Sequence, residues 1–209
     1  MGTLLDPLHQ ALLLDGLRLA HLAAIAAGLG CVIVTDLTML RWLGVPIGHR
    51  QGTALEAAHA IIGPALMAAW ITGLALVAAR TGFDPAAFSP KLLAKLGVVT
   101  LLSLNVILIL RYVQPVIVDY RGTGLLYIPF HHKLLFALSG ALSVAGWGAA
   151  LLLGGSHVVK PLGWDVLLPL LSAIYIATMV VTVSFALAAH LRLWLRQRRT
   201  PHDRPYLYA

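Results

Sequence analysis

Eight residues able to carry chemistry lie within or at the ends of long apolar stretches of this 209-residue chain. They are His21, Asp36, Glu56, His59, Lys95, Asn105, His132 and His190. Polar side chains in a bilayer are costly and often mark binding sites or ion pathways. Imidazoles on facing helices can hold heme iron, and neutral imidazole also suits copper or zinc. Heme is therefore the expected cofactor, with copper or zinc as the alternative, and there are four candidate ligands. These ligands are His21, His59, His132 and His190.

Helical rise, about 1.5 Å per residue, sorts these side chains into two levels. The level near one membrane face holds Asp36, Glu56, His59, His132 and His190. We expect these three imidazoles and two carboxylates to converge on one cluster, where Asp36 and Glu56 assist proton movement. His21 and Lys95 lie near the opposite face and predict a second site. There Lys95 would pair with a heme propionate or with a substrate carboxylate.

Small and polar residues at helical spacing predict the faces that turn toward other helices. Three such stripes are Glu56, His59, Gly63 and Trp70; His132, Phe136, Ser139, Ser143 and Gly146; and His21, Gly28, Val32 and Thr35. For the serines and glycines, helix packing is the favoured interpretation.

The composition requires a lipid-facing surface. Hydrophobic residues make up 59% of the chain and charged residues 11%, far below the roughly 25% charge of soluble domains. We expect an all-α membrane bundle, forming one domain, with about five transmembrane helices of about 20 apolar residues or more. The predicted spans are 17–43, 53–79, 90–112, 131–153 and 164–192, followed by a basic tail, 193–209. The connection 113–130 contains apolar stretches and is expected to lie along the interface or to fold back over the bundle.

Lysine and arginine predict the orientation. Ten lie on the side of the C-terminus and five on the other side, which places the C-terminus in the cytoplasm and the N-terminus outside. A basic tail after an apolar span indicates a cytoplasmic anchor rather than a nucleic-acid partner. We expect an integral protein of a bacterial inner membrane. The chain contains no C-x-x-C-H heme attachment motif, P-loop or H-E-x-x-H sequence.

The first three spans resemble the HemJ-type protoporphyrinogen oxidases and the related CopD-like membrane proteins. The resemblance covers about residues 15–112 and rests on Leu17–His21, on Glu56–Pro64 with Thr72-Gly73-Leu74, and on Lys95–Val99. It implies heme b binding through His21, a functional role for Lys95, and oxidation of a porphyrin. Leu104-Asn105 stands where the family usually has Tyr-His.

Three functions follow as hypotheses. The first is a heme-binding membrane oxidoreductase that passes electrons to a quinone or to a partner in the membrane. The second is transport of copper or another ion past Asp36, Glu56 and His59, although the four Met residues are scattered. The third is a structural or assembly subunit, either as a homo-oligomer or with other membrane subunits.

Overall fold

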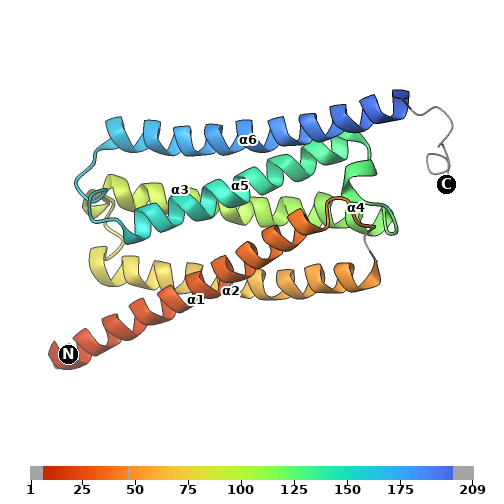
Figure 1. Cartoon of the computed structure of the whole chain (residues 1–209). Helices are drawn as coiled ribbons and strands as arrows, with labels where there is room; N and C mark the ends of the chain where they lie inside the picture. The colour runs from red at the N-terminus through yellow and green to blue at the C-terminus, as the bar shows by residue number, and fades with distance from the viewer. Residues whose placement is uncertain (1–6, 47, 200–209) are drawn as a thin grey trace.

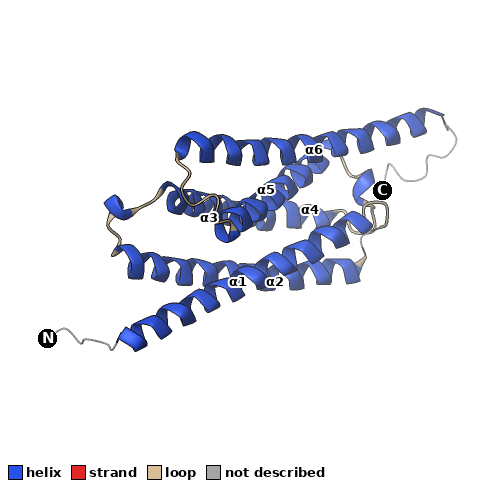
Figure 2. Ribbon diagram, turned by 60° about the vertical axis from the view of Figure 1, so that its left-hand side comes forward, coloured by secondary structure: helices blue, strands red, loops and turns tan. Residues whose placement is uncertain are grey.

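The computed structural model describes residues 7–46 and 48–199. Within these residues all regular elements are helices, apart from a single β-bridge between Pro46 and Gly124 (Figures 1 and 2). The long helices are α1 (Pro7–Arg41), α2 (His49–Thr81), α3 (Pro90–Leu108), α5 (Phe130–Gly155) and α6 (Trp164–Arg199). A short helix, α4 (Gln114–Asp119), continues the line of α3. Five helical segments are long and apolar enough to cross a membrane, as the sequence predicts.

Local sequence signals explain where the helices begin and end. The Ser89 side chain accepts a hydrogen bond from the Leu92 amide and caps α3, and Pro90 occupies the first turn, where a missing N–H costs nothing. The C-terminus of α2 is capped by Gly82, which adopts a left-handed conformation with φ of 57°.

The long helices alternate in direction and pair with specific neighbours. The helix α1 packs mainly on α2, while α5 lies between α3 and α6. Figure 1 shows α1 crossing α2 obliquely, so that its first turns leave the bundle. We call the side where α1 begins the N end, and the side where α6 finishes the C end. The N end also holds the start of α3, and the C end holds α4.

Two apolar clusters fill the bundle. One spans α1, α2, α3, α5 and α6 and includes Val32, Val98, Leu102, Trp147 and Leu167. The other covers the C end, where Leu55 packs with side chains of the 113–128 segment. Many large apolar side chains are instead exposed on the outer faces of the helices, as expected of helices long and apolar enough to cross a membrane.

The helices differ in extent from the predicted spans. The first begins at Pro7 and ends two residues before the predicted boundary, and the third continues through α4 to Asp119. Segment 113–130 folds back over the C end: the Leu126 amide donates to the Leu43 carbonyl, and Gly124 pairs with Pro46. The side chains of the arginine-rich tail, from residue 196 onward, lie outside the described residues.

A π-helical turn, η2 (Ile109–Val113), separates α3 from α4. Its wider hydrogen bond runs from the Gln114 amide to the Ile109 carbonyl. The cause is Pro115, which lacks an N–H and whose ring would crowd the carbonyl of Arg111, four residues earlier. Turns of this kind are frequent at functional sites, and this one borders the cavity described below.

The contact between Gly28 and Trp147 predicts a strong size limit at the crossing of α1, α2 and α5. A Cβ at Gly28 would lie 2.9 Å from the Trp147 ring and 3.5 Å from the Ala65 Cβ. We expect Gly28→Leu to destabilise the protein by about 1–3 kcal/mol through overpacking, lowering the thermal midpoint measured by circular dichroism in detergent. The matched change Gly30→Leu, two residues away in open space, should leave the midpoint unchanged or raise it. An equal loss in both variants would contradict this assignment.

Candidate functional site

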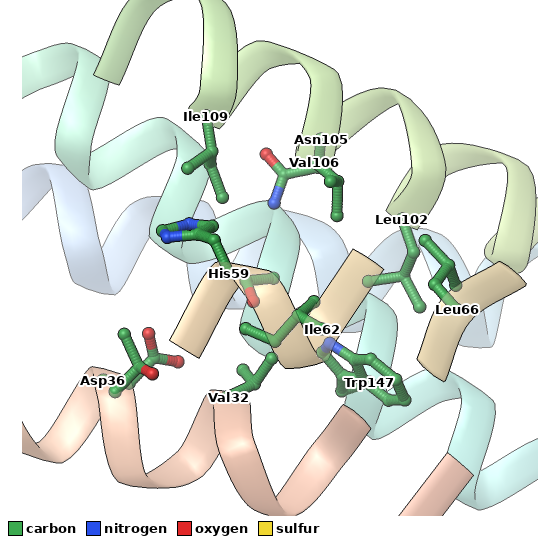
Figure 3. A pocket seen from close by; sticks show the side chains of 12 residues that line it. Val32, Asp36, His59, Ile62, Leu66, Leu102, Asn105, Val106, Ile109 and Trp147 are labelled. Atoms are coloured by element: carbon green, nitrogen blue, oxygen red, sulfur yellow. The ribbon is translucent and has the colours of Figure 1, made fainter. Parts of the chain in front are cut away.

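An internal cavity of about 50 Å³ lies between α1, α2, α3 and α5. Figure 3 shows Asp36, His59 and Asn105 extending into it from three different helices. The remaining lining is mainly apolar. It consists of Val32, Thr35, Ile62, Leu66, Leu102, Val106, Ile109, Ser143 and Trp147. No lysine or arginine lines the cavity.

The backbone fixes the imidazole of His59. Its Nδ1 lies 2.8 Å from the Leu55 carbonyl oxygen, and because a carbonyl can only accept, Nδ1 donates. In the neutral ring Nε2 then carries a lone pair, and no hydrogen bond to another described residue occupies it. This tautomer is the one that binds a proton or a metal through Nε2. His59 lies ten residues into α2, roughly 15 Å along the helix axis, well inside the apolar layer.

Asn105 is the most deeply buried polar residue of the site. Its side chain is 3% exposed, and its Nδ2 donates to the Ser139 carbonyl at 3.0 Å. Its Oδ1, however, is buried without a hydrogen-bond partner among the described residues. A buried unsatisfied acceptor costs about 1–3 kcal/mol, so a donor or a cation in the cavity would relieve a real penalty.

Asp36 supplies the one carboxylate of the cavity. It is half-buried on α1 and forms no ion pair or hydrogen bond with another described residue. The site therefore combines a carboxylate, the lone pair of an imidazole nitrogen and an unpaired amide oxygen. All three groups are electron-rich, so the cavity favours a proton, a water cluster carrying one, or a small cation.

The structure brings together only part of the predicted C-end cluster. Asp36 and His59 share the cavity, as predicted. Glu56 does not reach it: half of its side chain is exposed and it faces Arg121, with a nearest oxygen–nitrogen distance of 3.8 Å. The prediction that the stripe of Glu56 turns inward is therefore wrong for this residue. The buried face of α2 instead follows Leu55, Ile62 and Leu66, about a quarter turn away.

The remaining two C-end histidines make aromatic contacts. The His132 ring lies 4.0 Å from that of His131 and 5.4 Å from that of Tyr120. The His190 ring lies 4.9 Å from that of Phe130. No group of three or more His, Cys, Asp or Glu side chains within residues 7–46 and 48–199 is arranged to hold a metal ion. A single cluster of three imidazoles and two carboxylates is thus not formed.

At the N end, His21 of α1 is hydrogen-bonded to α2, and Lys95 lies near the start of α3 at the same end of the bundle. The His21 Nδ1 lies 2.9 Å from the Thr72 hydroxyl, which itself donates to the Ala68 carbonyl. His21 must therefore donate through Nδ1, leaving Nε2 as the acceptor. His21 and Lys95 thus lie at the same end of the bundle, and the second site that they would form stays a prediction.

Asn105 is one of the polar residues that the sequence places within an apolar span, but no role in a site is predicted for it. Its signal was present, because an amide within an otherwise apolar run needs an internal partner. Pro115 predicts an interruption of the helix but not that the interruption takes the form of a π-turn. Ser143 belongs to a stripe that the sequence predicts to face other helices, and it does line the cavity, whereas Trp147 carries no distinctive signal in the sequence.

Comparisons of the chain with protein-family models, with curated proteins and with solved structures found no match.

Proposed function

We propose that this chain is a membrane transport protein that moves protons, or a single small cation, by way of the cavity formed by Asp36, His59 and Asn105. The observation that carries the proposal is the unpaired Asn105 Oδ1, buried beside a carboxylate and a free imidazole nitrogen. Burying three unpaired acceptors in an apolar layer is costly unless a cation or a proton binds to them.

The size of the cavity supports a small substrate. A water molecule occupies about 10–15 Å³ on this scale, so roughly four waters fit. Organic ligands of drug size need roughly 300–1,000 Å³. The oxygen and nitrogen donors suit a proton or a hard cation better than Cu(I), which prefers sulfur. The thiol of Cys31 does not line the cavity and instead donates to the Ala58 carbonyl.

The direction of the protein in the membrane belongs to the same proposal. The excess of lysine and arginine places the C end in the cytoplasm. The cavity would then lie between the cytoplasmic cap, built from Leu55 and the 113–128 segment, and the larger apolar cluster toward the other face. Transport requires that each of these layers open in turn.

Reconstitution tests this function directly. Proteoliposomes containing a trapped pH dye are given a potassium diffusion potential, negative inside, and internal acidification is followed. We expect acidification faster than in protein-free liposomes from the same lipid. Parallel samples with external Na⁺, Zn²⁺ or Cu²⁺ and an ion-specific reporter identify a cation substrate. If neither protons nor any of these cations enters faster than in protein-free liposomes, the proposal is wrong.

Heme binding stays a second candidate because one observation favours it: the His21 Nδ1 donates to the Thr72 hydroxyl, which leaves Nε2 able to bind iron. The fit is poor in this structure. The cavity that His59 lines is too small for a porphyrin, and a larger groove of about 410 Å³ between α3 and α6 is not lined by a histidine. A visible spectrum of the purified protein decides the question. A Soret band with reduced α and β bands would favour heme and porphyrin chemistry, whereas a colourless protein would leave transport.

A further inference from the structure

A groove of about 410 Å³ runs between α3 and α6 in the half of the bundle near the N end. Its walls are apolar apart from Ser172 and the hydroxyl of Tyr175. They consist of Ala94, Gly97, Val98, Leu101, Leu168, Leu171, Ser172, Tyr175 and Ile176. Gly97 leaves open space, because a Cβ built there meets no atom within 4 Å. The groove lies on the side of the bundle, so in a membrane it faces acyl chains rather than water. It shares no residue with the cavity around His59.

Two lysines of α3, one helical turn apart, lie at the N-end rim of this groove. Lys91 lies one turn before Ala94 of the groove wall, and Lys95 follows Ala94 directly. A third cation, Arg80, lies in the last turn of α2 at the same end of the bundle. The ion pairs seen within the described residues lie elsewhere, so no carboxylate there neutralises these three cations. Mutual repulsion of unpaired cations near a membrane favours the binding of an anion.

Lys91 is held in place for such a contact. Its Nζ donates to the Ser156 carbonyl at 2.8 Å, at the end of α5. This bond uses one of the three ammonium donors and leaves two for another acceptor. Trp164, at the first turn of α6, is 44% exposed at the same end, where tryptophan commonly marks the membrane interface. The rim of the groove therefore lies at the level of lipid headgroups.

We propose that this groove binds an anionic phospholipid, with one acyl chain between α3 and α6 and its phosphate held by Lys91 and Lys95. Charge complementarity selects the headgroup, because ammonium donors bind phosphate oxygens as point charges. The apolar walls suit an acyl chain, because they are lined mainly by aliphatic side chains and lie on the side of the bundle. The inference goes beyond the transport proposal and does not depend on it, since it uses a different face of the bundle.

Native mass spectrometry of the full-length protein in detergent tests the inference. Phosphatidylglycerol and phosphatidylcholine with identical chains are added in turn, and glycerol phosphate serves as the free anion. We expect phosphatidylglycerol to bind best and glycerol phosphate not to be retained. Lys91→Gln and Lys95→Gln should each lower phosphatidylglycerol binding by about fivefold. Gly97→Leu should reduce binding of both lipids by filling the groove.

Two further variants serve as controls for this experiment. Lys91→Arg retains the charge and should retain the preference for phosphatidylglycerol. Lys160→Gln removes an exposed loop cation at the same end and should change nothing. Thermal midpoints confirm that each variant is folded. Equal binding of the two lipids by the unmodified protein, or undiminished binding by the folded Gly97→Leu variant, would overturn the proposal.

Discussion

Asp36→Asn is expected to lower the transport rate in proteoliposomes by roughly ten- to hundredfold, which corresponds to losing a charge-assisted interaction of about 1.5–3 kcal/mol. Asparagine has nearly the same shape as aspartate but carries no charge and accepts no proton at neutral pH. The apolar packing around the cavity is therefore preserved while its single carboxylate disappears. Initial rates of dye acidification, or of cation entry if the substrate is a cation, provide the measurement.

The control for this change lies on the same helix. Asp15 is also on α1, but it is exposed and paired with Arg18. Asp15→Asn makes the identical chemical change outside the cavity and should leave the rate as it was. Asp36→Glu keeps the charge and should restore part of the activity. If Asp36→Asn transports as fast as the unmodified protein, the cavity is not the pathway.

The second large effect is expected at Asn105, where function and stability should change in opposite directions. Asn105→Leu removes the unpaired Oδ1, whose burial costs about 1–3 kcal/mol. The Ser139 carbonyl loses the Asn105 donor but lies within α5, where the helix backbone also bonds it. We expect a thermal midpoint equal to or higher than that of the unmodified protein, and a transport rate at least about tenfold lower.

Opposite changes in transport rate and thermal midpoint would distinguish a functional role of Asn105 from a purely structural one. A residue retained only for packing would lose stability on substitution, and transport would fall only as folded protein is lost. Asn105→Asp adds a second carboxylate and should tighten binding of a cation, which is measured as a lower half-saturation concentration. A stable Asn105→Leu protein that transports normally would remove Asn105 from the site and with it the main support for the proposed function.

The fold was predictable because hydropathy alone requires it. Each long apolar run must satisfy its backbone hydrogen bonds internally, and a helix does so within one segment. The ends were less predictable. The first helix extends ten residues earlier than its predicted span, because Pro7–Gly16 is compatible with helix although it is less apolar. The fate of segment 113–130 depended on tertiary contacts such as that of Leu126 with Leu43.

The candidate site was predictable only in part. Helical rise correctly placed Asp36 and His59 at one level, since depth follows from counting residues. The face each side chain takes depends on how every helix is rotated against its neighbours. Glu56 precedes His59 by less than one turn, yet it points to Arg121 while His59 enters the cavity. His132 and His190 lie at a suitable depth and still turn toward aromatic rings.

The cavity is closed in different ways toward the two ends of the bundle. On that side, main-chain pairing of Leu126 with Leu43 and of Gly124 with Pro46 joins two distant loops. Toward the N end, the cavity is closed by side chains such as Leu102 and Trp147. Rotating a side chain takes far less time than separating paired backbone segments. In an alternating-access cycle, opening toward the N end would therefore be fast and opening toward the C end slow. The slow opening at the C end would then limit the rate of turnover.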